Sequence, residues 1–266
     1  MASSSSDALY LYALTNAEHV HVPSSGVGEG IVVMPCDSWT AVVDTVPADT
    51  WAGAQAEDNL RELAWVAPRA CTHEEVVEAI MKQGPVYPAR FGTLFSSADQ
   101  LQHTVQKHRD ALTTFFGEVN GAEEWSVKGY LDREQAAAAQ MEDLQTDALS
   151  GTAYLQRRKQ AQDADTAVDA WLDTVADRLA STLKAQTRAL ALRPATTRAT
   201  PSQTPVVHWD TLVPTTERAA FLRQVDALHS QYHAQGLHLE PSGPWPPYTF
   251  RPSLNDVPSS PGRSYG

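Results

Sequence analysis

Two histidine pairs have the spacing in this chain that comes closest to a chemical site. His229 and His233 stand four residues apart, which is how a helix presents two imidazoles to one metal ion. The residues between them are Ser, Gln and Tyr, so the Glu of a His-Glu-x-x-His metalloprotease is missing. His19 and His21 alternate along an extended segment and would share one face. No third ligand accompanies either pair, so we expect histidines at the border of a core, and no metal.

Other catalytic motifs also fail to appear. His73 falls on the apolar face of its predicted helix, which favours a buried histidine bonded to a neighbour. The glycine run GVGEG, Gly26–Gly30, is not Gly-x-Gly-x-x-Gly and opens no helix, so we interpret it as a hairpin connection and not as a phosphate loop. No Walker lysine, Gly-x-Ser-x-Gly or Cys/His nucleophile pattern occurs. We therefore expect no catalytic residue, no cofactor and no enzymatic activity.

The charge balance excludes some classes of partner. The chain has 266 residues, and 32 acidic against 20 basic residues give a formal net charge of -12. Binding to nucleic acid or to an anionic membrane surface relies on Lys and Arg, so both are disfavoured. Only two cysteines occur, fewer than a secreted disulfide scaffold would have. A signal peptide has basic residues before its apolar run, and the N-terminal apolar run here has none before it. These features predict a cytoplasmic protein.

The first half of the chain predicts one α+β domain over residues 1–121. Three strand-like runs come first, and Thr72 to Glu75 has the pattern of a capping box that would begin a helix ending at Gly84. The two prolines of Pro85–Phe91 predict an edge or irregular strand. The expected strands are Leu9–Leu14, Ile31–Met34 and Thr40–Val46, and a last helix is expected over Ser97–Phe116.

The second half predicts a ferredoxin-like domain over residues 122–240, because its elements follow the order β-α-(β)-β-α-β. Its longest helix would run from about Thr152 to Leu192 with Leu190 in its apolar stripe, and the bracketed strand would lie in Arg193–Pro205. The other expected elements are strands Glu123–Asp132, Val206–Val213 and Leu237–Glu240 and helix Pro214–Ala234. Residues 241–266 form a proline and aromatic tail with a disordered end. The fold class is thus α+β with two domains.

The tail contains the stretch SGPWPPYTF, in which Trp245, Tyr248 and Phe250 stand among three prolines. Prolines exclude a helix or a central strand here, yet each aromatic ring can bury roughly 150–250 Å². Two hypotheses follow. The segment folds back and packs one domain against the other, which we favour because clustered aromatics usually pack inside a protein, or it presents its rings to a partner, since aromatics are common interface anchors.

Six phrases in order resemble the gas vesicle protein F/L family. They are LYLYAL, WTAVVDTVP, APRACTHEEVVEAIMKQGPVYPARFGTLF, EEWSVKGYLD, GTAYLQRRK and SGPWPPYTF, which together extend over most of Leu9–Phe250. Tyr87 and Ala89 stand where that family pattern favours aliphatic residues, and HWDTLVP is more polar than the usual strand. Neither departure touches a catalytic motif. The third phrase includes Arg90 and Phe91, which we add to the tail aromatics as candidate interdomain or partner contacts.

The resemblance implies a two-domain α+β protein with a ferredoxin-like C-terminal half. It also implies a non-enzymatic accessory role in forming gas vesicles, with the hydrophobic major shell protein, gas vesicle protein A, and sibling accessory proteins as partners. Two other classes remain as alternatives: a small-molecule-binding regulatory module on a ferredoxin-like domain, and a metal-dependent enzyme using His229 and His233. Neighbouring genes for small hydrophobic shell proteins would favour the first function.

Overall fold

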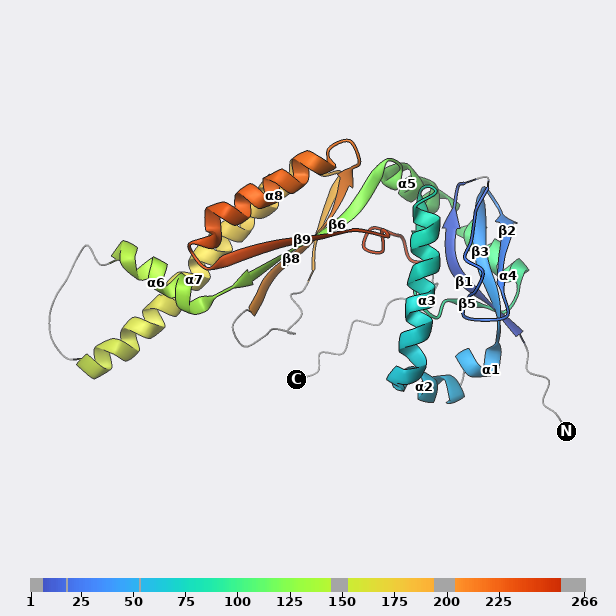
Figure 1. Cartoon of the computed structure of the whole chain (residues 1–266), viewed down its shortest axis with the longest axis horizontal. Coiled ribbons are helices and arrows are strands. Elements are labelled where there is room, and N and C mark those ends of the chain that lie inside the picture. Colours follow the sequence, from blue (N-terminus) through green and yellow to red (C-terminus); the bar gives the residue numbers. More distant parts are fainter. Residues whose placement is uncertain (1–6, 18, 53, 145–152, 194–203, 255–266) are drawn as a thin grey trace. The chain divides into compact units, whose positions relative to one another are not determined.

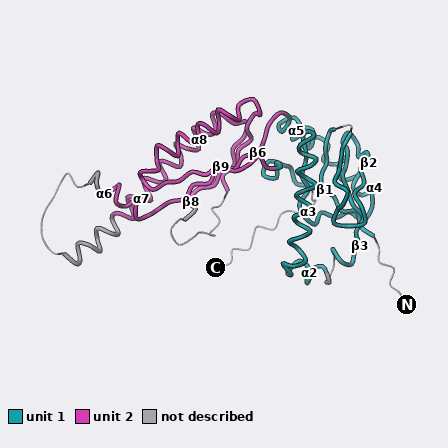
Figure 2. Tube along the Cα trace, in the orientation of Figure 1, with its two compact units in different colours: residues 1–120, 246–266 teal, residues 121–245 magenta. Residues whose placement is uncertain are grey.

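The computed structural model describes residues 7–17, 19–52, 54–144, 153–193 and 204–254. The chain divides into two compact units (Figure 2): unit 1 contains residues 1–120 and 246–266, and unit 2 contains residues 121–245. The expected tail, residues 241–266, is therefore shared, because its first five residues belong to unit 2 and the described part beyond them to unit 1. Its expected disordered end, residues 255–266, lies outside the described residues.

Unit 1 is built on an antiparallel sheet with the strand order β2-β3-β1-β4, in which β5 also pairs with β1. The apolar runs predicted to be strands are strands, and the proline segment supplies β4 at the edge of the sheet, where a missing N–H costs no ladder bond. The strands are β1 Asp7–Thr15, β2 Ile31–Cys36, β3 Trp39–Pro47, β4 Val86–Pro88 and β5 Leu94–Phe95.

Helices cover both faces of this sheet. Tyr10 and Tyr12 of β1 contact His73 of α3, whereas Trp39 of β3, pointing to the opposite face, stacks on Phe116 of α5 with ring centroids 5.6 Å apart. The unit therefore has three layers around β1, a strand whose residues are mostly buried. Its helices are α1 Ala48–Trp51, α2 Ala54–Arg61, α3 Leu63–Met81, α4 Ala98–Lys107 and α5 Arg109–Val119.

Two sequence predictions for these helices are wrong. Thr72 begins no helix: it lies inside α3, where its hydroxyl donates to the Pro68 carbonyl at 3.1 Å. The capping pattern misled because the helix starts nine residues earlier, at Leu63. The helix predicted over Ser97–Phe116 is two helices that meet at His108. Ser97 does cap the first of them, accepting a hydrogen bond from the Gln100 N–H at 3.2 Å.

Unit 2 contains an antiparallel sheet with the strand order β7-β8-β6-β9. Helices α7 and α8 pack on one face (Figure 1). There, Leu179 of α7 and Phe221 of α8 join Trp209 of β8 in a single hydrophobic core. The elements are β6 Ala122–Leu131, α6 Arg133–Leu144, α7 Ala153–Lys184, β7 Ala189–Leu192, β8 Thr204–Pro214, α8 Arg218–His233 and β9 Leu237–Trp245. No helix in the described parts of the chain combines the length and the apolar composition needed to cross a membrane.

The bracketed strand in the predicted order of unit 2 comes earlier than expected. Helix α7 ends at Lys184 and not at Leu192, and Leu190 belongs to β7. The apolar residues of this strand continue the helical period of α7, which is why the sequence could not separate them. The stretch expected to hold the strand, Arg193–Pro205, lies mostly outside the described residues.

Strand β9 is also longer than predicted, ending at Trp245 and not at Glu240. It lies at an edge of the sheet and pairs only with β6, so its prolines Pro241 and Pro244 are tolerated. The prediction that the stretch SGPWPPYTF forms neither a helix nor a central strand is confirmed. The end of β9 nevertheless adds Trp245 to the sheet opposite Glu124.

Candidate functional site

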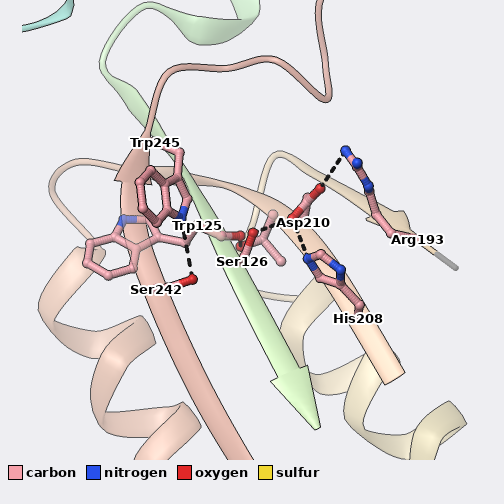
Figure 3. A network of polar contacts seen from close by, with 8 residues as sticks. Trp125, Ser126, Arg193, His208, Asp210, Ser242 and Trp245 are labelled. Atoms are coloured by element: carbon pink, nitrogen blue, oxygen red, sulfur yellow. Dashed lines mark hydrogen bonds and ion pairs between the residues drawn. The ribbon is translucent and has the colours of Figure 1, made fainter. Parts of the chain in front are cut away.

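The five candidate contact residues divide between the two units. Trp245 ends β9 in unit 2, whereas Tyr248, Phe250, Arg90 and Phe91 belong to unit 1. Trp245 is 44% exposed, and its indole N–H donates to the Ser242 hydroxyl at 3.3 Å (Figure 3). The sequence therefore grouped residues that belong to different units, and of the five only Trp245 and Arg90 are exposed.

His73 is the centre of a polar cluster in unit 1. It is completely buried, as expected, and its Nδ1 accepts a hydrogen bond from the Tyr10 hydroxyl at 2.8 Å. Its Nε2 lies 3.2 Å from the Ala89 carbonyl oxygen and 3.3 Å from the Tyr248 hydroxyl oxygen. A carbonyl can only accept, so the hydrogen of the neutral ring lies on Nε2. Burial lowers the pKa of His73 to about 4, which keeps the ring neutral.

Tyr248 joins the returning C-terminal segment to helix α3. Its hydroxyl donates to Glu74 Oε1 at 2.9 Å, while its oxygen faces His73. Burial raises the pKa of Tyr248 above its ordinary value, and the Glu74 carboxylate raises it further. Burial likewise raises the pKa of Glu74, an effect that the bond from Tyr248 partly offsets. Tyr10 donates to His73, the His73 Nε2–H faces the Tyr248 oxygen, and Tyr248 donates to Glu74. These hydrogen bonds hold each of the four side chains in one orientation.

Arg251 and Pro252 fasten the same segment to strand β4. The Arg251 guanidinium donates to the Tyr87 hydroxyl at 3.1 Å and lies over the Tyr87 ring, and that hydroxyl donates to the Pro252 carbonyl at 2.9 Å. Leu254 is buried beside them. The cavity left among these residues, which Arg90 also lines, has a volume of about 20 Å³, too small for an organic ligand. This part of unit 1 is a packed seam and not a ligand pocket.

A second polar cluster surrounds Asp210 in unit 2 (Figure 3). Asp210 is 2% exposed, and its carboxylate accepts a hydrogen bond from Ser126, directly opposite on β6. His208 Nε2 lies 3.1 Å from the same oxygen, and Arg193 Nη1 lies 3.3 Å from the other. Burial lowers the pKa of His208, although Asp210 acts in the opposite direction.

These residue types match a Ser-His-Asp triad, but their order in space does not. In a triad the histidine stands between the serine and the aspartate, so that it can take the hydroxyl proton. Here Ser126 and His208 both bond to Oδ1 of Asp210, and the serine hydroxyl hydrogen points to the carboxylate. The arrangement neutralises a buried carboxylate and gives Ser126 no general base.

The glycine run folds over a second buried carboxylate, Asp44 of β3. Asp44 accepts hydrogen bonds from the N–H groups of Gly28 and Gly30, each at 2.9 Å, and from the Tyr12 hydroxyl at 3.1 Å. A Cβ added at Gly28 would lie 2.1 Å from the Thr45 carbonyl oxygen, so only glycine fits this close approach. The run is thus more than a connection, because it satisfies a carboxylate that has no exposed surface.

The structure places His238 of β9 beside the pair His229 and His233. The spacing of His229 and His233 on a helix did not reveal this third histidine, although it follows His233 by five residues. The glycine at Gly236, whose φ of 83° favours a turn, is the signal that could have found it. His19 and His21 are both exposed.

The chain also presents a hollow on unit 2, with a volume of about 800 Å³, whose mostly apolar lining also includes Asp173, Asp177 and Arg193. Helix α7 forms one wall, and strands β7 and β8 form the other. Leu192, which is 71% exposed, lies at this hollow with Leu190 and Trp209. Such a surface is the kind that protein partners cover.

Comparisons with known proteins agree on one family. The sequence model of the family described as "Gas vesicle synthesis protein GvpL/GvpF" matches residues 8–252. The chain is 28% identical over 251 residues to gas vesicle protein L of a Streptomyces species, covering 91% of each chain. It is 26% identical over 272 residues to gas vesicle protein L2 of Halobacterium salinarum, covering 94% of this chain and 93% of that one.

Two crystal structures of GvpF share the fold. The structure from Anabaena matches with a TM-score of 0.67 at 18% identity, over 93% of this chain and 97% of that one. The structure from Microcystis aeruginosa matches with a TM-score of 0.62, also at 18% identity, over 91% of this chain and 98% of that one. Since the family match extends over nearly the whole chain, this protein belongs to the gas vesicle synthesis protein GvpL/GvpF family.

Proposed function

We propose that this protein is a non-enzymatic accessory or minor structural protein of gas vesicle assembly in the cytoplasm. It binds the hydrophobic major shell protein, gas vesicle protein A, and sibling gas vesicle proteins. The observation that carries the proposal is the family match over residues 8–252, together with relatives named as gas vesicle proteins over more than nine-tenths of their length.

The physical logic is that of an escort. A shell protein with a gas-facing apolar surface aggregates if it is released into water alone. An acidic chain with a formal net charge of -12 remains dispersed while it covers such a surface. Trp245 and the hollow at Leu192 are the exposed apolar features of unit 2 that such a partner would contact.

The geometry of the polar clusters supports a role without turnover. The His73 cluster is packed against the returning segment, and the Asp210 cluster joins two strands. In each cluster the polar side chains form hydrogen bonds with one another. Ser126 lacks the general base that hydrolysis would need.

We also propose that the two units are separate domains and that unit 2 is a ferredoxin-like domain. Its elements follow β6-α-β7-β8-α8-β9, with α6 as an addition before α7, and its strand order is β7-β8-β6-β9. That arrangement interleaves two βαβ units, with both principal helices on one face of an antiparallel sheet. The domain then offers one helical face and two edge strands, β7 and β9, for contact with partners.

The test combines gene deletion in the host with binding. We expect the deletion to abolish or stunt vesicles, and the untagged wild type to restore them. Co-expression should keep the shell protein soluble and allow the two to be co-purified, with only a modest loss in moderate salt because the contacts are apolar.

A sibling of the same family can mask the deletion, so the binding measurement decides. The proposal fails if neither the shell protein nor another gas vesicle protein co-purifies with this chain. A truncation after Glu240 is unsuitable here, because it removes half of β9 and the segment that packs on unit 1. Single substitutions at exposed residues are the better variants.

A further inference from the structure

Three histidine rings meet at the outer edge of unit 2, where helix α8 runs beside strand β9 (Figure 1). His229 and His233 lie one turn apart on α8, and His238 follows on β9 after the turn at Gly236. The ring centroids are 5.1 Å apart for His229 and His233, 5.9 Å for His229 and His238, and 4.6 Å for His233 and His238. One nitrogen from each ring can be chosen so that all three lie within 4.8 Å of one another.

The site is open to solvent without being loosely held. His233 is exposed and His229 and His238 are half-buried, so an ion can enter from water without disturbing the core. His229 and His233 lie on the helix and His238 lies on the strand. Because both elements belong to the same packed unit, the backbone positions of the three histidines are fixed relative to one another. In the described part of the chain, this is the only group of three potential metal-ligating residues so arranged.

The ligand set determines which ion would bind. Imidazole nitrogen suits zinc and its neighbours nickel and copper, whereas calcium and magnesium require oxygen ligands. Asp132 and Glu240 are close enough to act electrostatically on His238, and their negative charge favours a nearby cation. We propose that His229, His233 and His238 bind one divalent transition-metal ion of the zinc class, with a water molecule completing the coordination.

One contact must change when the ion binds. His229 Nδ1 accepts a hydrogen bond from the Leu239 N–H at 3.1 Å, so the hydrogen of the neutral ring lies on Nε2. An ion at Nε2 would need that hydrogen moved to Nδ1, where it would face the Leu239 N–H, and an ion at Nδ1 would replace this N–H directly. Either way the Leu239 amide loses its acceptor. Metal binding should therefore leave the Leu239 N–H without its hydrogen bond to His229, which can be measured.

The experiment uses the untagged full chain, treated with chelator and then titrated with zinc chloride in a calorimeter. We expect a one-to-one isotherm, a rise in thermal midpoint in the presence of zinc, and no binding of calcium. Hydrogen exchange of the Leu239 amide should become faster relative to the other amides of β9.

Variants separate this site from other histidines. His233→Ala and His238→Asn should each weaken zinc binding by at least about 100-fold, since even partners outside the coordination sphere contribute 10–100-fold. His233 is exposed, so its substitution should leave the fold intact. His103→Ala, an exposed histidine on α4, and the double variant His19→Ala/His21→Ala should bind as the wild type does.

Three results would overturn the proposal. They are the absence of zinc binding by the wild type, unchanged affinity in both His233→Ala and His238→Asn, and an equal loss in the His103→Ala control. This site is independent of the role in vesicle assembly, so either proposal stands if the other fails.

Discussion

The Tyr248 hydroxyl donates a hydrogen bond to Glu74 Oε1 at 2.9 Å, across 174 residues of sequence. The pair joins the C-terminal segment to helix α3 within unit 1, so this unit needs both ends of the chain. Unit 2 is inserted between two pieces of unit 1, and the chain passes between the units twice. Loss of the C-terminal segment should therefore destabilise the N-terminal unit.

The first prediction concerns Tyr248→Phe, which removes the hydroxyl and keeps the ring. The bond to Glu74 and the contact with His73 are lost, and we expect the free energy of unfolding of unit 1 to fall by about 1–2 kcal/mol. Urea denaturation followed by a probe in unit 1 measures it. Tyr130→Phe is the control, because the structure shows no hydrogen bond for that half-buried hydroxyl among the described residues. Equal effects of the two variants would contradict the prediction.

The second prediction is a pH dependence from His73. Its pKa is about 4 in the folded protein against an ordinary 6.5, so between these values the unfolded chain binds a proton that the folded protein does not. The free energy of unfolding thus rises with pH across this range. A contribution of about 3 kcal/mol is fully present above the upper value and is lost as pH falls to the lower one.

The comparison with His73→Gln isolates this contribution from those of other groups. Glu74, whose pKa is raised, acts in the opposite direction, and Tyr10, Tyr248 and Arg251 also face the ring or act on it. All four remain in the variant. Unfolding measured at several pH values from 4 to 6.5 should show a flatter slope for His73→Gln than for the wild type. Parallel slopes would show that His73 does not titrate as stated.

The third prediction tests the glycine run over Asp44. Gly28→Ala would place a Cβ 2.1 Å from the Thr45 carbonyl oxygen and 2.7 Å from Asp44 Oδ1, so the run must move and the buried carboxylate loses partners. We expect a loss of about 2–4 kcal/mol in the free energy of unfolding. Gly84→Ala is the matched control, since nothing lies within 4 Å of its added Cβ. Thermal unfolding of both variants decides, and a stable Gly28→Ala protein would contradict the close approach.

The sequence predicted most strands, because apolar alternation and proline act locally. Pro88 marked β4 as an edge, and the run around Val207 marked β8. It failed where a local signal was overridden. Thr72 carries a capping pattern inside a helix, and Leu190 continues the period of a helix that has already ended.

The sites were harder to predict than the strands because they depend on distant contacts. Nothing near Asp44 in the sequence indicates that glycines 16 and 14 residues earlier would bind its carboxylate. Tyr248 was identified as an aromatic contact, but its partner Glu74 carried no signal beyond charge. His238 was missed because it reaches the pair from another element, strand β9, after the turn at Gly236.

The last prediction concerns Trp245, which the sequence analysis favoured as a packed residue. Because Trp245 is 44% exposed, we expect Trp245→Ala to lower the free energy of unfolding by at most about 1 kcal/mol. The control Trp209→Ala, at a residue that is 2% exposed, should lower it by about 3–5 kcal/mol.

If Trp245 anchors the shell protein, Trp245→Ala should weaken binding by more than about tenfold, because a buried interface tryptophan typically contributes over 1.4 kcal/mol. Leu63→Ala, at 77% exposure on unit 1, tests whether any exposed apolar residue has this effect, and it should bind normally. Co-purification with the shell protein and thermal unfolding are measured on the same preparations. A large loss of stability in Trp245→Ala with unchanged binding would show that Trp245 packs within the protein and is not an anchor. Truncating an anchor for a partner should weaken the complex more than it destabilises the folded chain.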